Sequence, residues 1–410
     1  MHHNPEHTWG HALAFGDEYY QKVTEILRQI RGDAEIYTGI ATWAVEALRA
    51  GNKVYSEAAV GHMPPFEMAD EREGNPAQIH LCGHNCTAED FAALRPGDVL
   101  LTNHVSEPVR AARDAGVYVA YFTTAYVNSS KTPPGKVHAN PNDWLPEDVA
   151  SIVVDTHIPW NQGVVHMSHM PEMPAFPSAT NGTCAIHWLL TAEVAHAMAT
   201  DSMPDGSAAC RYLDLLLERL AEVRAGDMER INETAEIISK RIIGGGRFFV
   251  RSRNEGVRSE SNGTAMGLML TNAFETRSAI ESGDKDTFLI AAVSANDAQE
   301  LAWAREAREN GNYLIGIGPL DNDGLRQACD VYFDDRCDEP AGVVEIPGMA
   351  EKVCPATGII NNIIMHMLTA QFVDEMCRRG AVPYFWMGAY MKEGSAYNGV
   401  MGSFFRDRGY

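Results

Sequence analysis

Four side chains in the stretch HLCGHNC are of types that bind zinc: His80, Cys82, His84 and Cys86. In an extended strand, alternate residues share a face but advance about 6.6 Å per pair, so these side chains would span about 20 Å. Bonds of about 2.0–2.3 Å to one ion then require the backbone to curl, which Gly83 permits. We predict no metal here, with a metal site as the minor alternative. His84 is instead expected at the end of a strand, where it can contact a ligand.

A second group of histidines is compared with a similar stretch later in the chain. His166 and His169 lie in VVHMSHMPEM, and His157 precedes them. The later stretch VVEIPGMAEK lacks both histidines but keeps the glutamate, so that Glu351 matches Glu172. The shared pattern predicts a strand, a turn and this glutamate rather than a metal site.

The stretch RSRNEGVRSESNG follows a predicted strand and precedes a predicted helix. Its arginines can bind a phosphate or carboxylate through paired N–H donors, and its small polar side chains can add hydrogen bonds. The alternative is a solvated loop in which the arginines pair with Glu255 and Glu260. The candidate binding residues of this stretch are Arg251, Arg253, Arg258, Ser259 and Asn262.

Alternating helical and strand patterns position these residues. The chain begins with helical patterns at residues 17–31 and between Asp33, a plausible N-cap, and Gly51. Strand-like runs follow, several of them continuously apolar, as in strands that helices cover on both faces: KVYSEAAV, AQIHL, DVLLTNHV, VYVAYFTT and SIVVDTHI. We therefore expect a parallel sheet between helices, with SSKTPPGKVHANPND as a surface loop.

The second half of the chain repeats this order. After a long apolar helix and the turn-rich stretch DSMPDGSAA, two helical patterns lead to GGG and to further strand-like runs: RFFVRS, DTFLIAAVS, YLIGIGP, CDVYFDD and GVVEI. Residues 151–173 align without a gap with residues 330–352, displaced by 179 positions, so that Asp155 meets Asp334 and Gly163 meets Gly342. We predict an internal duplication, with domains at 1–203 and 204–410.

Composition narrows the possible partners. The 55 acidic and 33 basic residues give a net charge of −22, which disfavours nucleic acid and anionic membranes. No apolar run reaches the roughly 20 residues of a spanning helix, and the start lacks the core of a signal peptide. Eight scattered cysteines suggest a reducing compartment, so a cytoplasmic location is expected.

Each half resembles a sugar isomerase (SIS) domain. The resemblance lies in LIAAVSANDAQELAWAREARENG, YLIGIGP, ACDVYFDD and EIPGMAEKVCPATGIINNIIMHMLTAQFVDEMCRRG, and in VGHMPPFEMADEREG, which is similar to a GHSH…AEE segment of single-SIS proteins. It implies two three-layer α/β/α domains, each with a parallel five-stranded, Rossmann-like sheet. In the family two copies pair to form the sugar site, so the resemblance implies an internal pseudo-dimer and further association into a homo-oligomer such as a dimer.

Family members hold a sugar phosphate in a Ser/Thr-rich loop at a helix N-terminus, where the dipole favours an anion. The second half keeps Ser294 but has Asn296 and Asp297 in this loop, and an aspartate there caps the helix and repels an anion. The first half has only NHVSEP, which contains His104. The substrate is therefore expected to be unusual, and it need not carry a phosphate.

Aldose–ketose isomerisation moves a proton through an enediolate and needs a base and a group that opens the sugar ring. Glutamate and histidine serve in related enzymes, which by position implies catalytic roles for Glu351, Glu172, Glu67 and His62. The alternative for Glu172 and Glu351 is that they pair with neighbouring backbone. Hydroxyl and amide groups expected near the sugar are those of Ser178, Thr180, Thr357 and Asn398.

The leading interpretation is a sugar or sugar-phosphate isomerase-like enzyme that needs no cofactor, with its site between the two halves. Lyase or deglycase reactions through the same enediolate are related options. The alternative is a non-catalytic sugar-binding or regulatory protein, which the altered phosphate loops and the tail favour, since related proteins have Glu-His-Asn where this chain has Ala396, Tyr397 and Asn398.

Overall fold

The structure is a computed structural model that describes residues 14–123, 144–168, 170–171, 173–272, 282–337, 342–388, 391 and 393–410. Three features of the sequence analysis lie outside these ranges: the predicted loop at 129–143, His169 and Glu172.

The first half follows the predicted order of helices and strands. Its elements are α1 (Phe15–Gly32), α2 (Ala34–Arg49), β1 (Val54–Ser56), α3 (Pro64–Glu67), β2 (His80–Leu81), α4 (Ala88–Ala93), β3 (Val99–Thr102), α5 (Glu107–Asp114), β4 (Tyr118–Phe122), η2 (Pro146–Asp148), β5 (Ile152–Val154), β6 (Gly163–Val165), β7 (Ala175–Pro177) and α6 (Ala179–Thr200).

The second half repeats this order, except that a single long helix precedes its first strand and a further helix follows at its C-terminal end. Its elements are α7 (Ser207–Ile243), β8 (Phe248–Ser252), α8 (Gly256–Ser261), α9 (Met269–Asn272), β9 (Thr287–Ala291), α11 (Ala298–Glu309), β10 (Tyr313–Gly318), α12 (Asp323–Ala328), β11 (Val331–Asp334), α13 (Thr357–Arg378) and α14 (Gly394–Arg408). The two helical patterns predicted before GGG form the single helix α7. Gly226 in its interior allows Arg336 to approach, since an added Cβ would lie 2.9 Å from Arg336 Nη2.

Each half contains a parallel sheet. The first has five parallel strands, as predicted, and their order is β2-β1-β3-β4-β5. The second has four strands in the order β11-β10-β9-β8 within the described residues, one fewer than predicted. The predicted strand GVVEI contributes only an isolated bridge between Val344 and Val353.

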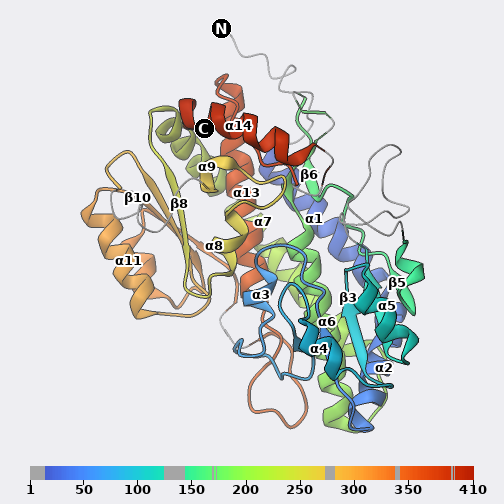
Figure 1. Ribbon diagram of the computed structural model, residues 1–410. Helices are drawn as coiled ribbons and strands as arrows, with labels where there is room; N and C mark the ends of the chain where they lie inside the picture. Colours follow the sequence, from blue (N-terminus) through green and yellow to red (C-terminus); the bar gives the residue numbers. More distant parts are fainter. Residues whose placement is uncertain are drawn as a thin grey trace.

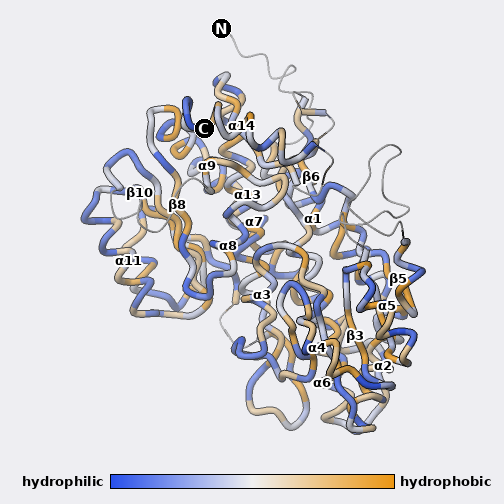
Figure 2. The backbone as a smooth tube through the Cα atoms, viewed as in Figure 1, coloured by the Kyte–Doolittle hydropathy of each residue, from blue (hydrophilic) through white to orange (hydrophobic). Residues whose placement is uncertain are grey.

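The sheets lie on opposite sides of a shared layer of helices, α1, α6, α7 and α13 (Figure 1). One hydrophobic cluster runs through this layer and the inner faces of both sheets, and includes Leu27, Trp188, Leu216 and Phe372. Smaller clusters fill the outer faces, under α5 in the first half and under α11 in the second. Hydrophobic residues accordingly concentrate along buried strands, including β8 at the edge of the second sheet (Figure 2). Because the two halves share one core, burial of apolar surface holds them together.

Two pairs of residues that align in the sequence have the same local structural role in both halves. Gly163 and Gly342 lie where the chain folds back on itself, and an added Cβ would meet Pro174 O at 1.8 Å and Val353 O at 2.1 Å. Asp155 and Asp334 accept a hydrogen bond from the N–H two residues later. Those aspartates thus stabilise a left-handed backbone conformation at His157 (φ 59°) and Arg336 (φ 60°).

None of the helices in the described ranges is long and apolar enough to cross a membrane.

Candidate functional site

A hollow of about 470 Å³ opens at the carboxyl edge of the first sheet. The ends of β1, β3 and β4 and the residues after β5 form one wall, and the first turns of α6 form the other. Ligands of open α/β sheets bind beyond the carboxyl ends of the strands, so this hollow is the candidate site. Its polar lining residues include Ser56, Asn103, Thr123, Thr156, Thr183 and His187.

Hydrogen bonds fix most of these polar groups in place. The Asn103 amide, oriented so that both ends are satisfied, donates to Glu57 O at 3.1 Å and accepts from Val60 N at 3.2 Å. The Thr156 hydroxyl donates to Thr123 O at 2.9 Å, and the Thr156 N–H donates to the Thr123 hydroxyl at 3.0 Å. The hydroxyl of Thr183 has no partner in the described part of the chain. The wall therefore presents fixed hydroxyl and amide groups.

His187 is the one titratable side chain among the described residues that line this hollow. It is 3% exposed, and among the described residues neither ring nitrogen has a hydrogen-bond partner. Burial lowers its pKa to about 4, so that the ring is neutral at pH 7 and offers one N–H donor and one acceptor. An unpaired buried polar group costs about 1–3 kcal/mol, which a ligand in the hollow can recover. Sequence analysis missed His187, because a lone histidine in an apolar helix is usually a core residue.

Glu67 lies outside the hollow, where the two halves meet. It is fully buried, and its Oε2 accepts hydrogen bonds from Arg72 Nε at 3.3 Å and Asn254 Nδ2 at 3.2 Å. The backbone N–H of Gly358, in the first turn of α13, also points at the carboxylate. Burial raises the pKa of Glu67, and Arg72 opposes that rise. Arg72 Nη2 in turn donates to the Thr357 hydroxyl at 2.8 Å.

Glu260 has the reciprocal position and was not predicted. This residue of α8 is buried, and its Oε2 accepts hydrogen bonds from the Thr180 hydroxyl at 2.6 Å and from the N–H groups of His62 at 2.8 Å and Met63 at 3.2 Å. Each half thus sends a carboxylate to the first turn of the other half's long helix. In both carboxylates the second oxygen, Oε1, has no partner within the described ranges.

Glu260 also supports the hollow. Ala179 lines it while the next residue, Thr180, bonds Glu260, and Val60 lines it just before His62. The second half of the chain therefore fixes two segments of the wall in the first half. The imidazole Nδ1 of His62 lies 3.2 Å from Ser259 O and 3.0 Å from Asn262 O, so these three predicted residues do come together.

The three predicted anion-binding arginines have different surroundings, although burial and the nearby charge of Arg258 together lower the pKa of Arg251. Arg251 is buried in β8, with its guanidinium 5.8 Å from the centre of the Phe288 ring. Arg258 pairs with Glu255 at 2.9 Å, as in the solvated-loop alternative. Arg253 is exposed, and its backbone N–H donates to the carboxylate of Glu300 at 3.3 Å. Burial raises the pKa of Glu300 to about 8.

The predicted phosphate loop of the second half is bridged by side chains. Asn296 donates its N–H to Asn322 Oδ1 at 3.1 Å and accepts from Gly324 N at 3.2 Å, while Asn322 Nδ2 donates to Ser294 O at 3.4 Å. Asp297 caps α11 by accepting from two backbone N–H groups, as predicted. These contacts tie the loop around Asn296 to Asn322 and Gly324 at the start of α12.

Other predicted residues have local roles. Ser178 donates to Gln162 O at 2.9 Å, His84 Nδ1 lies 2.9 Å from Ala59 O, and His104 Nε2 lies 2.8 Å from His84 O. Asn398 holds both backbone polar groups of Met387 at 2.8 Å within the C-terminal tail.

Glu351, His166 and His157 are not among the described residues that line the hollow. Glu351 is exposed and makes no hydrogen bond or ion pair in the described structure. His166 Nδ1 lies 3.2 Å from Glu18 Oε1, and His157 Nε2 lies 2.6 Å from Asp33 Oδ2.

Comparison with known proteins supports the fold. The chain is similar to a proposed phosphosugar isomerase of Clostridium difficile, with a TM-score of 0.52 and 11% identity over 91% of this chain and 96% of the other. The chain therefore shares the α/β fold of that structure. The C-terminal domain of glucosamine-fructose-6-phosphate aminotransferase from Francisella tularensis is similar at a TM-score of 0.48 and 10% identity, over 90% of this chain and 98% of that domain.

Sequence comparison adds a distant relative. A UPF0309 protein of Streptomyces griseus is 21% identical over 246 residues, which cover 50% of this chain and 98% of that protein. No family model matches the sequence.

Proposed function

We propose that this chain binds a sugar or sugar phosphate in the hollow at the carboxyl edge of the first sheet and isomerises it. The observation that carries the proposal is His187, a buried neutral imidazole with both ring nitrogens unpartnered within the described residues, in a wall of hydroxyl and amide groups. Among the described residues that line the hollow there is no lysine or arginine. The part of the substrate that enters it is therefore the uncharged, carbonyl-bearing end.

In the proposed reaction, the neutral His187 removes a proton from the carbon next to the carbonyl group. The electron pair moves onto the carbonyl oxygen and forms an enediolate. The imidazolium then gives its proton to the former carbonyl carbon, while the proton of the adjacent hydroxyl passes to the former carbonyl oxygen. The new carbonyl thus forms at the adjacent carbon, and the ring is neutral again at the end of the cycle. Thr183, one helical turn before His187 on α6, and Asn103 on the opposite wall hold the sugar hydroxyls.

In this proposal the two buried carboxylates position the helices. Glu260 holds the first turn of α6, and Glu67 holds that of α13, across the boundary between domains 1–203 and 204–410. The sequence also predicted catalytic roles for Glu67, His62 and Glu351, and these stay predictions that the same assay tests.

A second candidate function is sugar binding without turnover. The bridged loop around Asn296 in the second half, together with Asp297 at its helix, favours this alternative, because the usual phosphate position is closed.

A thermal-shift screen of sugars and sugar phosphates, followed by solvent deuterium exchange at C2, separates the two functions. A ligand at about 100 times its Kd adds about 2.7 kcal/mol to the free energy of unfolding. Isomerisation requires that deuterium enter C2 of a stabilising sugar and that His187→Gln lose this exchange while retaining the thermal shift. A thermal shift without exchange in the wild-type chain supports the binding protein. A stabilising sugar that binds equally to Thr183→Asn places the site elsewhere.

A further inference from the structure

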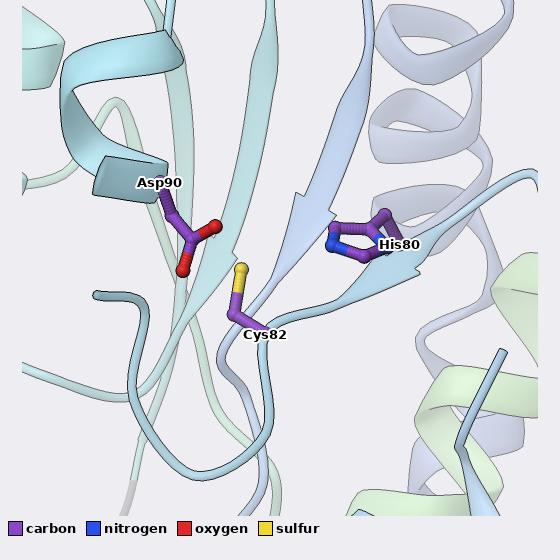
Figure 3. Close-up of side chains that lie close together, drawn as sticks. All are labelled: His80, Cys82 and Asp90. Carbon is purple, nitrogen blue, oxygen red and sulfur yellow. The ribbon is translucent and has the colours of Figure 1, made fainter. Parts of the chain in front are cut away.

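Three metal-binding side chains meet beside the edge strand of the first sheet. The ligand atoms of His80, Cys82 and Asp90 all lie within 4.8 Å of one another. Figure 3 shows the three side chains pointing toward a common space between β2, the following turn and α4. They are half-buried or exposed, so their side chains can rotate toward an ion.

The backbone between them is curled. The strand ends at Leu81, Gly83 has a φ of +82°, and α4 begins at Ala88. The chain therefore changes direction between Leu81 and Ala88, which brings Asp90 back toward Cys82. The extended geometry that argued against a metal in HLCGHNC is therefore wrong for this segment.

Cys86 offers a fourth ligand atom. Its thiol is close enough to Cys82 for a side-chain hydrogen bond, and its backbone N–H donates to Glu57 Oε2 at 2.8 Å. Both cysteines are free thiols. Cys86 therefore lies next to one of the three ligands and is the candidate for the fourth.

Asp90 and His80 each use one side-chain atom in hydrogen bonds to neighbouring residues. The other carboxylate oxygen of Asp90 and the other ring nitrogen of His80 are left to bind an ion. Asp90 Oδ2 accepts from the Thr87 N–H at 2.7 Å and the Thr87 hydroxyl at 2.8 Å, so Oδ1 is available. His80 Nδ1 bonds Asp70 Oδ2, and Asp70 Oδ1 accepts from Leu81 N at 2.9 Å. A carboxylate on one ring nitrogen is the usual support of a metal-bound histidine, because it fixes the ring and its tautomer.

We propose that His80, Cys82, Cys86 and Asp90 form a tetrahedral site for a thiophilic divalent cation of the zinc type. Two sulfurs, one imidazole nitrogen and one carboxylate oxygen are ligands that zinc accepts, and magnesium or calcium would require oxygen. Tetrahedral bonds of about 2.0–2.3 Å place donor atoms about 3.3–3.8 Å apart, so the cluster closes by roughly 1 Å on binding. With four protein ligands the site is closed, and its role is to fix the β2–α4 turn.

The site is separate from the hollow and independent of the proposed isomerase reaction. His84, which lies between Cys82 and Cys86, bonds Ala59 O next to the hollow, so the metal would stabilise this wall without touching the sugar.

The test is a titration of the reduced, chelator-treated full chain with Co²⁺, followed by displacement with Zn²⁺. We expect thiolate-to-cobalt charge-transfer absorption that saturates at about one equivalent and disappears with zinc. Cys82→Ser and Cys86→Ser should each lose most of this absorption, and Cys210→Ser, at a half-buried free thiol elsewhere, should retain it. Histidines near the N-terminus give no thiolate absorption and contribute equally to every variant.

Two further measurements test the site even if a cysteine variant folds poorly. Asp70→Asn leaves all four ligands in place and should weaken Co²⁺ binding about 10–100-fold, since it removes the support of His80. Zn²⁺ should raise the melting temperature of the wild-type chain and of Cys210→Ser, but not that of Cys82→Ser. A wild-type chain without thiolate absorption, or absorption unchanged in Cys82→Ser, overturns the site.

Discussion

The carboxyl-edge crevices of the two halves differ at two helical positions. Counted from the starts of α6 and α13, Thr183 corresponds to Asn361, and His187 corresponds to Met365. In the first half, Thr183 and His187 line a hollow. In the second half, Asn361 reaches across and donates to Ala292 O at 2.7 Å, and Met365 is buried in the core.

This comparison shows how the same order of elements can place different side chains at equivalent positions of the two halves. The strands, the preceding turn and the long helix follow the same order in both halves, so the backbone does not decide the difference. A longer amide in place of a threonine bridges the helix to the end of the adjacent strand. An apolar thioether in place of an imidazole removes the group that could move a proton.

The largest expected effect on turnover comes from replacing His187 with methionine, the residue at the equivalent position of the second half. His187→Met should lower kcat about 10²–10⁴-fold, the usual contribution of a general base, while the fold is retained because methionine fills a similar volume. The measurement is the rate of deuterium exchange into a sugar that the thermal-shift screen identifies.

The matched control is His366→Met in α13. His366 is equally buried but packs against Tyr19, with ring centres 5.2 Å apart, and does not line the hollow. Equal losses of turnover in both variants would mean that His187 acts only through packing.

Neutralising the two buried carboxylates, Glu67 and Glu260, should lower the free energy of unfolding by different amounts. Glu67→Gln leaves the buried Arg72 guanidinium without its carboxylate and should lower the free energy of unfolding by about 3–5 kcal/mol. The hydroxyl and backbone N–H groups that donate to Glu260 are neutral, so Glu260→Gln should cost about 1–3 kcal/mol. Urea unfolding followed by tryptophan fluorescence measures both.

A double variant tests the cause of the Glu67 effect. Glu67→Gln with Arg72→Met removes both charges and should recover part of the lost stability. If Glu260→Gln alone costs as much as Glu67→Gln, the ion pair does not account for the difference.

Transferring the bridging residue should close the hollow. Thr183→Asn places the amide of the second crevice in the first and should weaken sugar binding about 100-fold, because the longer side chain occupies the space. Thr183→Ser, which keeps the hydroxyl and adds no volume, is the control, and calorimetric titration gives both affinities. Unchanged affinity in Thr183→Asn would place the ligand outside the hollow.

The smallest expected effect is a pH dependence of stability. The pKa of His187 is about 4 in the folded chain and about 6.5 when unfolded, so the unfolded state binds more protons between these values. Stability due to the neutral ring is present above pH 6.5 and lost as the pH falls toward 4, by about 2 kcal/mol between pH 7 and 5.

His187→Met should flatten this part of the profile. His366, whose burial lowers its pKa to about 3, contributes in the same direction, so the difference between wild type and the single variant isolates His187. Parallel profiles of the two chains would show that His187 is not held neutral by burial.

The amino-acid sequence by itself determined the order of elements and much of the fold. Apolar runs such as those of β3, β9 and β10 predict buried parallel strands, because a strand covered on both faces needs apolar residues at every position. Matching Gly163 with Gly342 and Asp155 with Asp334 located the same turns in both halves, since tight turns depend on local backbone conformation.

Only the tertiary structure decided which side chains meet. Glu260 contacts Thr180 and His62 across the boundary between the halves, and His187 faces the ends of strands that are distant in sequence. The curl at Gly83 that unites His80, Cys82 and Asp90 also depends on contacts of the turn with β1. The periodicity of a sequence reports which face of an element is buried, whereas the identity of the neighbour on that face depends on packing between distant segments.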